Sequence, residues 1–248
     1  MMKANRWNVE GVFMTVLDMR EVSGGYSTKE DTIHEITLSV KEGEWLGLLG
    51  PNGAGKSTII KALLDLLPVK RGEITLPGPE EYAFIPEHPI FFEDLTLWEH
   101  IDFMRAVTGL DEEETTERAE YLLKLFRLTK VRNHYPTAFS KGMQQKLMII
   151  LALTAKPKLY IIDEPFIGLD PKAMKDLLRE LEAERERGAC VLMSTHVLDT
   201  AEKICDRFVL VNYGTIIAEG TLDDIRRESG VDGSLLDCFD ELMTEEEL

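Results

Sequence analysis

The segment GPNGAGKS at residues 50–57 constrains the fold of this chain more than any other feature. Residues 45–50 before it are apolar and predict a buried strand, whereas residues 58–67 after it carry apolar side chains at helical spacing. The pattern G-x-x-x-x-G-K-[ST] between a strand and a helix is the context in which a glycine-rich loop binds phosphate. A chance match to the pattern alone is expected roughly once in a hundred chains of this length. We therefore predict a phosphate-binding loop.

The residue types of this loop explain why it would bind a nucleotide. Gly50, Gly53 and Gly55 allow backbone conformations that a Cβ atom would forbid, so that N–H groups can point at phosphate oxygens. The helix that begins near Lys56 adds the positive end of its dipole, and the Lys56 ammonium adds a charge for the β- and γ-phosphates. The Ser57 hydroxyl can ligate Mg²⁺. The predicted nucleotide-binding residues of the loop are Gly50, Pro51, Asn52, Gly53, Ala54, Gly55, Lys56, Ser57 and Thr58.

The overall composition excludes several other classes of protein. The formal net charge of −17 disfavours binding to nucleic acid or to anionic lipid surfaces, because both require lysine and arginine. No stretch approaches the ~20 apolar residues of a membrane span, and residues 1–13 lack the apolar core of a secretory signal. The cysteines have no metal-type or disulfide-type spacing and predict buried or incidental thiols in a reducing compartment; they are Cys190, Cys205 and Cys238.

Strands alternate with helices along most of the chain, which predicts an α/β fold, a P-loop NTPase core with a mainly parallel sheet. Residues 16–22 and 33–40 predict strands of a small antiparallel part near the N-terminus. Between residues 91 and 139 glycine nearly vanishes and helical spacing prevails, which predicts an inserted α-helical subdomain. The expected segments are an N-terminal extension (1–14), the first half of the ATP-binding core (15–90), the helical subdomain (91–139), the second half of the core (140–222) and an acidic helical tail (223–248).

Ligands of parallel α/β sheets bind at the carboxyl ends of the strands, and further candidate residues lie at such ends. Asp163 follows the apolar run 159–162 and fits the acid that holds Mg²⁺. Glu164 is either a solvated turn residue or the base that polarises an attacking water, and the phosphate loop favours the base. A lone histidine is usually structural, but His196, which follows the strand 189–193, can donate to a γ-phosphate. Together with Lys56, Glu164 and His196 form the predicted catalytic set.

In this order the motifs resemble the ATP-binding subunits of ABC transporters, over about residues 15–222. Walker A is 50–57, the signature segment is 139–143, Walker B is 159–163 followed by Glu164, the D-loop is 168–170, and the H-loop histidine is His196. The resemblance implies ATP as the nucleotide, Mg²⁺ as the cofactor, and hydrolysis of ATP to ADP and phosphate.

The resemblance also implies roles that the residues alone leave open. Tyr26 lies in the expected turn 23–27, where it is either a half-packed tyrosine or a stacking platform; the resemblance implies that it stacks on adenine. It implies a head-to-tail dimer in which Ser140 and Gly142 of one copy close over the γ-phosphate held by the other, and it places Asp170 at the nucleotide. Phosphoryl transfer suits such a dimer, because positioning and charge stabilisation do nearly all the catalysis.

Three positions depart from the family pattern. The usual signature LSGGQ is FSKGM here, so that Lys141 replaces a glycine and Met143 replaces the glutamine. Ser140 and Gly142 remain, and Lys141 either adds a cation at the phosphate or faces solvent. Glu87 stands where the family has the glutamine of the Q-loop; its carboxylate can still ligate Mg²⁺ and would make the site more acidic. The predicted metal ligands are Ser57, Asp163 and Glu87.

Within the family, segments 84–89, 93–100 and 139–146 are most similar to the Ecs-type ATPases of Gram-positive bacteria. That resemblance implies a separate polytopic membrane subunit (EcsB-like), a position at the cytoplasmic face of the membrane, and a role in protein secretion or peptide handling. Phe91, Phe92 and Trp98 would line the groove for the partner's coupling helix, or alternatively belong to the subdomain core. The alternative function is an ABC ATPase that acts on a cytosolic partner, as in iron–sulfur assembly or regulation.

Overall fold

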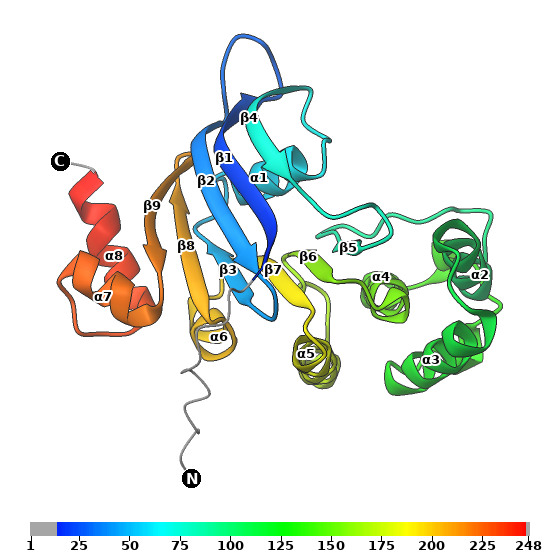
Figure 1. Cartoon of the computed structure of the whole chain (residues 1–248). Helices are drawn as coiled ribbons and strands as arrows, with labels where there is room; N and C mark the ends of the chain where they lie inside the picture. Colours follow the sequence, from blue (N-terminus) through cyan, green and yellow to red (C-terminus); the bar gives the residue numbers. More distant parts are fainter. Residues whose placement is uncertain (1–13, 247–248) are drawn as a thin grey trace.

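The computed structural model describes residues 14–246, so that the expected N-terminal extension lies outside the described residues apart from Met14. The larger of its two sheets has the strand order β5-β6-β7-β3-β8-β9 (Figure 1). Five of these strands are parallel, and β9 pairs with β8 in the antiparallel direction. The predicted α/β fold with a mainly parallel sheet is therefore confirmed. The strands are β3 (Trp45–Leu49), β5 (Tyr82–Ile85), β6 (Leu159–Asp163), β7 (Cys190–Thr195), β8 (Arg207–Asn212) and β9 (Thr215–Gly220).

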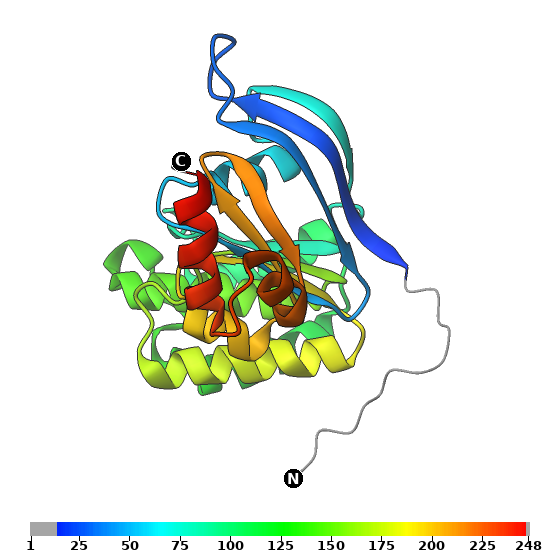
Figure 2. The same ribbon diagram turned by 90° about the vertical axis from the view of Figure 1, so that its left-hand side faces the viewer.

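The smaller sheet is antiparallel and has the order β2-β1-β4, with β1 (Thr15–Gly25), β2 (Ile33–Lys41) and β4 (Val69–Thr75). Figure 2 shows its long strands, in blue and cyan, curving over the rest of the molecule. Strand β1 is longer than the expected strand 16–22, because Gly24 and Gly25 pair with Lys70 and Val69 of β4. The expected turn 23–27 is therefore wrong in its first half. The partner strand lies more than 40 residues away, so local sequence could not reveal this pairing.

The larger sheet is buried on both faces, which explains its nearly continuous apolar strands. Along β6, Leu159 and Ile161 belong to one core with α1 (Lys56–Leu63) and the small sheet. Tyr160 and Ile162 belong to the opposite core with α4 (Lys141–Ala155) and α5 (Pro171–Glu186). Helix α1 thus fills the space between the two sheets. It ends at Leu63 rather than near residue 67, since Asp65 has a left-handed φ of 59° that stops the helix.

Helices α2 (Leu97–Thr108) and α3 (Glu112–Leu125) pack against each other and against α4, at the β5 end of the larger sheet (Figure 1). A capping box of Thr96 and Glu99 opens α2, and Asp111 caps α3. Two short 3₁₀ turns, η1 (Thr129–Val131) and η2 (Pro136–Ala138), lead into α4. Helix α4 begins at Lys141, because the Ser140 hydroxyl accepts a hydrogen bond from the Met143 N–H at 3.3 Å and caps the helix.

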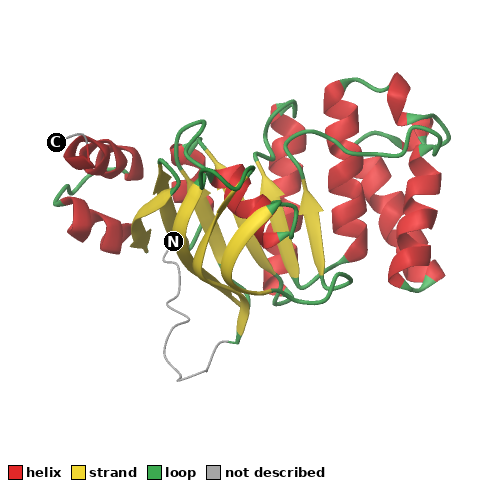
Figure 3. Ribbon diagram, turned by 90° about the horizontal axis from the view of Figure 1, so that it is seen from above, coloured by secondary structure: helices red, strands yellow, loops and turns green. Residues whose placement is uncertain are grey.

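The C-terminal tail forms α7 (Leu222–Ser229) and α8 (Leu235–Glu246), which lie at the other end of the molecule from α2 and α3 (Figure 3). One face of α8 is apolar and packs against the rest of the molecule. Leu235, Phe239 and Leu242 are buried in a third core together with α6 (Leu198–Ile204) and strands β8 and β9. Leu236 is exposed, because it lies one position off the i, i+4, i+7 face.

The cysteines are free thiols, as their spacing predicts. Cys190 and Cys238 are buried, and Cys205 is half-buried. Burial raises the pKa of Cys190 to about 12 and raises the pKa of Cys205 still further. Both thiols therefore stay protonated at neutral pH and are poor nucleophiles and metal ligands.

A buried ionic network joins α3 to α5. The Arg118 guanidinium lies 3.1 Å from Glu180 Oε2 and 3.1 Å from Glu184 Oε1, and the two glutamate side chains are 7% and 4% exposed. The Tyr121 hydroxyl donates to Glu180 Oε1 at 2.7 Å. Because two buried carboxylates share one guanidinium, removal of the arginine leaves negative charge without a full set of donors.

We predict that Arg118→Met lowers the free energy of unfolding by about 3 kcal/mol, the lower end of the range for breaking a buried ion pair. The lower end is expected because Arg179 still contacts Glu180 and Arg187 still contacts Glu184. Urea denaturation followed by circular dichroism measures the change. Lys124→Met, at an exposed position of the same helix, serves as the control and should change stability by less than about 0.5 kcal/mol. Equal losses in the two variants would contradict the prediction.

Candidate functional site

The glycine-rich loop lies between the carboxyl end of β3 and the first turn of α1, as the sequence predicts. Gly55 precedes the helix with a φ of 109°, a conformation that side chains with a Cβ rarely adopt. A Cβ there would also lie 3.2 Å from Gly214 Cα and 3.3 Å from Ile33 Cγ2. The loop therefore requires glycine at this position both for its backbone shape and for the space beside it.

The turn between β8 and β9 braces this loop from outside. The Gly214 N–H donates to Ala54 O at 2.8 Å, and the Gly214 carbonyl accepts from the His34 N–H at 2.8 Å. These two bonds link the phosphate loop, the β8–β9 turn and the start of β2. Sequence reasoning did not identify this brace, because its parts lie 20 to 180 residues apart along the chain.

The Lys56 side chain contacts the first residues of the loop. Its Nζ donates to Gly50 O at 2.8 Å and to Pro51 O at 3.1 Å, and it lies 3.6 Å from Glu164 Oε1. The residue is only 6% exposed. An ammonium group in so little water, facing a loop of backbone donors, is a site for a further anion.

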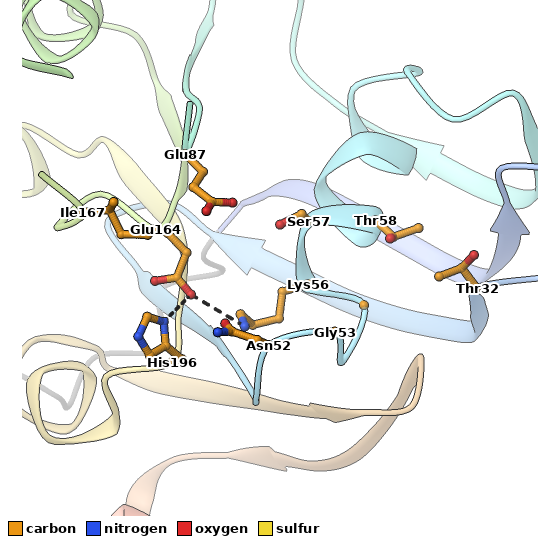
Figure 4. A pocket seen from close by; sticks show the side chains of 11 residues that line it. Thr32, Asn52, Gly53, Lys56, Ser57, Thr58, Glu87, Glu164, Ile167 and His196 are labelled. Atoms are coloured by element: carbon orange, nitrogen blue, oxygen red, sulfur yellow. Dashed lines mark hydrogen bonds and ion pairs between the residues drawn. The ribbon is translucent and has the colours of Figure 1, made fainter. Parts of the chain in front are cut away.

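The predicted catalytic residues meet at the edge of the sheet where β6 and β7 end (Figure 4). His196 Nδ1 lies 2.9 Å from Glu164 Oε1, the same oxygen that faces Lys56. Asp163 and Glu164 are each 6% exposed, so that Glu164 is not a solvated turn residue. The structure thus brings together Lys56, Glu164 and His196, which are separated by up to 140 residues in the sequence.

A cavity of about 470 Å³ opens in front of these residues. Most of its lining was predicted from the sequence, and Thr32 and Ile167 were not, because neither belongs to a motif with phosphate chemistry. Gly50, Pro51, Ala54 and Asp163 contribute to the loop and to the Walker B strand end but do not line the cavity. The lining residues are Thr32, Asn52, Gly53, Gly55, Lys56, Ser57, Thr58, Glu87, Glu164, Ile167 and His196.

Tyr26 lies beside the first turn of α1, just outside the cavity lining. Its hydroxyl lies 3.3 Å from Thr58 Oγ1 and accepts from Lys61 Nζ at 3.3 Å. Lys61 Nζ is also 5.2 Å from the ring centroid, within range of a cation–π interaction. The residue is 54% exposed, so the ring is accessible from solvent, and its stacking on adenine stays a prediction.

The signature segment and the D-loop contact each other rather than the cavity of their own protomer. A Cβ on Gly142 would lie 2.6 Å from Gly168 O, so only glycine allows this approach. Asp170 caps α5 through the Ala173 N–H and pairs with Lys146 Nζ at 2.8 Å. The hydrogen bond from Lys146 lowers the pKa of Asp170 to about 2, which keeps the carboxylate ionised at neutral pH. None of Ser140, Gly142 and Asp170 reaches this cavity, and their contact with a second copy stays a prediction.

The oxygen donors at the cavity fit Mg²⁺. Ser57 and Glu87 line it, and Asp163 lies directly behind Glu164 at the end of β6. Residues 14–246 hold no group of three or more His, Cys, Asp or Glu side chains that could bind a metal by themselves. Mg²⁺ does not require such a group, since it takes one or two protein oxygens and completes its shell with water and phosphate.

Helix α4 also contacts the segment that carries Glu87. Gln145 Nε2 donates to Pro86 O at 3.3 Å, and the side chain is 2% exposed. The aromatic residues that follow this segment and were expected as anchors differ in burial. Phe91 and Trp98 pack against the core, as the alternative interpretation held, whereas Phe92 is 55% exposed.

No helix among residues 14–246 is both long enough and apolar enough to cross a bilayer.

Comparison with known proteins identifies close relatives. The family described as ABC transporter matches residues 33–167, more than half of the chain. YthP of Bacillus subtilis (strain 168), named as an uncharacterized ABC transporter ATP-binding protein, is 51% identical over 216 residues, 87% of this chain and 91% of YthP. EcsA of the same organism, named as an ABC-type transporter ATP-binding protein, is 41% identical over 244 residues, 94% of this chain and 98% of EcsA.

Solved structures share the fold over nearly the same range. One, described as an ATP-binding subunit of an ABC transporter, is 44% identical, with a TM-score of 0.88 over 92% of this chain and all of that chain. Another, a dimeric ATP-binding cassette in a post-hydrolysis state bound to ADP and Pi, is 25% identical, with a TM-score of 0.72 over 83% of this chain and 98% of that one. With its glycine loop, paired strand-end acids and histidine in place, the chain belongs to the ABC transporter ATP-binding family, whose ATPase domains use ATP and Mg²⁺.

Proposed function

We propose that this chain is the motor subunit of an Ecs-type transporter, that it hydrolyses ATP at the interface of a head-to-tail dimer, and that it drives a separate polytopic membrane subunit. The proposed ATP hydrolysis is supported by one observation: Lys56, Glu164 and His196 lie together at one cavity beside the phosphate loop. The 41% identity to EcsA, an ABC-type transporter ATP-binding protein, supports the assignment to the Ecs type. With that type we propose an EcsB-like partner and a role in protein secretion or peptide handling.

In this proposal the triphosphate lies in the loop 50–57 and the adenine stacks on Tyr26. The loop N–H groups and the α1 dipole bind the β- and γ-phosphate oxygens, and Lys56 turns from Glu164 towards the γ-phosphate. Ser57, Glu87 and Asp163 would hold Mg²⁺, directly or through water, and the ion would neutralise charge on the phosphates.

Glu164 is then released to act on water. Its carboxylate orients the water and accepts a proton as the water oxygen attacks the γ-phosphorus; the bond to the ADP oxygen breaks as the new bond forms. His196 holds Glu164 through Nδ1, and we assign its other ring nitrogen, Nε2, to the γ-phosphate. Competition between phosphate and Glu164 for Lys56 would couple ATP binding to activation of the base.

A second copy would close the site. Ile167 and Val197 are exposed apolar side chains, and Ile167 lines the cavity itself. Ser140, Gly142 and Asp170 lie on a surface of the same protomer that does not reach this cavity, which is the arrangement expected of a head-to-tail dimer. The dimeric relative with bound ADP and Pi supports this assembly.

The membrane subunit would dock on the helical subdomain, for which we propose residues 91–139. In this division the ATP-binding core consists of residues 15–90 and 140–222, and residues 223–248 form the tail. Four exposed apolar side chains lie near the start and along α2. The rings of Phe92 and Phe103 contact each other at 5.1 Å, edge to face, and are suited to anchor a helix of the partner. The patch consists of Ile90 (73% exposed), Phe92 (55%), Phe103 (47%) and Val107 (70%). The chain would then sit at the cytoplasmic face of the membrane through this contact.

We predict that Lys56→Ala weakens ATP binding about tenfold or more, because a charge-assisted contact to phosphate is lost. Glu164→Gln should bind ATP normally and hydrolyse it about 10²- to 10⁴-fold more slowly, because it retains shape but loses the base. Fluorescent-nucleotide titration and phosphate release measure the two effects, with exposed Lys175→Ala as the control. Normal turnover in either variant would refute the proposed catalytic site.

For Glu87→Gln, we expect a higher Mg²⁺ concentration for half-maximal hydrolysis, by about two- to tenfold, because a neutral amide is a weaker ligand than a carboxylate. A Mg²⁺ titration at saturating ATP measures this shift. An unchanged Mg²⁺ dependence, together with unchanged stimulation by the membrane subunit, would remove Glu87 from the metal site.

The double variant Phe92→Ser/Phe103→Ser should lose its co-purification with the membrane subunit and keep its own ATPase rate within about twofold, because the anchors lie outside the cavity. Leu66→Ser, which changes another exposed apolar side chain, is the control and should still co-purify. If the unaltered chain remains in the cytosolic fraction, the function on a cytosolic partner is favoured instead.

A further inference from the structure

Two consecutive hydroxyl residues at the end of β7, Ser194 and Thr195, lie against the two acids of the site. Both are fully buried, and neither belongs to the motifs singled out above. Successive side chains of a strand point to opposite faces, so the two hydroxyls serve different partners. They contact Asp163 and Glu164 separately.

The Ser194 hydroxyl has a fixed orientation. It accepts a hydrogen bond from the Glu164 N–H at 3.2 Å and donates to Asp163 Oδ1 at 2.5 Å. The Ser194 carbonyl accepts from the same Glu164 N–H at 3.2 Å. Because Oδ1 of Asp163 is bound in this way, Ser194 fixes how the Asp163 carboxylate is turned, and Oδ2 would be the oxygen left for Mg²⁺ or its waters.

The Thr195 hydroxyl is fixed in the same manner on the other acid. It accepts from the Val197 N–H at 3.1 Å and therefore has its proton free to donate to Glu164 Oε2, which lies at 3.3 Å. His196 lies at the other carboxylate oxygen, Oε1. Both oxygens of Glu164 thus have a partner, one on the last residue of β7 and one on the residue directly after it.

Glu164 also has a backbone that needs such support. Its φ is 47°, a left-handed conformation that is unfavourable for a residue with a Cβ. Conformations of this kind persist where the surroundings over-determine them. Here the two bonds from the Glu164 N–H to Ser194 and the side-chain bond from Thr195 provide that support.

We propose that Ser194 and Thr195 are positioning residues with separate tasks: Ser194 orients Asp163 and so sets the Mg²⁺ requirement, whereas Thr195 orients Glu164 and so sets the rate of the hydrolytic step. The inference rests on the roles proposed above for the two acids. In this view Mg²⁺ binding and activation of the attacking water are each controlled by one hydroxyl group at the end of the same strand.

The test compares Ser194→Ala with Thr195→Val and Thr195→Ser. Partners of catalytic and metal-binding groups typically change affinity or activity by about 10- to 100-fold when they are lost. We expect Ser194→Ala to raise the Mg²⁺ concentration for half-maximal hydrolysis about tenfold while kcat at saturating Mg²⁺ stays within about threefold. We expect Thr195→Val to lower kcat about tenfold or more with an unchanged Mg²⁺ requirement, and Thr195→Ser to restore most of the rate.

Binding of fluorescent ATP in EDTA reports whether each variant is folded, since it needs neither Mg²⁺ nor turnover. If Ser194→Ala does not fold, Ser194→Cys replaces it, because a thiol fills similar space but donates weakly. The inference would be overturned if Ser194→Ala and Thr195→Val changed the same parameter, either the Mg²⁺ requirement or kcat, to the same extent. A Thr195→Ser variant as slow as Thr195→Val would overturn it as well. If Glu164→Gln is inactive while Thr195→Val hydrolyses ATP at the normal rate, only this inference is refuted. If Glu164→Gln is active, the proposed function is refuted.

Discussion

Parallel pairing of β6, β7 and β3 is the constraint on which the rest of this structure depends. Strand β7 lies between the other two, and the register pairs Asp163 with Ser194 and Leu49 with Thr195. All three strands therefore end at the same level of one sheet edge. The loops that leave them carry the glycine segment, the two acids and His196. Hydrophobic burial on both faces holds these strands in place, so polar groups meet at the edge without a polar interior.

The charge distribution of the site resolves an apparent conflict. A chain with a net charge of −17 would repel a nucleotide triphosphate if the charge acted as a whole. At physiological salt, however, exposed charges are screened beyond about 8 Å. The buried Lys56, the loop N–H groups and the α1 terminus determine the local potential instead. The Lys56 contact with Glu164 balances the buried charges of both groups.

Sequence alone predicted those parts of the molecule that are encoded locally. The glycine loop and the acids after an apolar run each carry their signal within a few residues. The extension of β1 to Gly25, the brace from Gly214 to Ala54 and the Arg118 network depend on partners distant in sequence, and no single segment predicts them. The aromatic residues after Glu87 show the same limit. The family resemblance left them as either anchors or core, and only packing distinguished exposed Phe92 from half-buried Phe91 and Trp98.

The contact between α4 and α5 has a mechanical consequence. Gly142 abuts Gly168 without room for a methyl group, and Lys146 is paired with Asp170 one helical turn further along α4. The first turn of α4 and the loop before α5 are therefore joined by a close backbone contact and by an ion pair, so we expect them to move together. Gln145 of α4 also donates a hydrogen bond to the backbone of Pro86, next to Glu87. A displacement of the first turn of α4 is therefore expected to reach both the loop before α5 and the segment that carries Glu87.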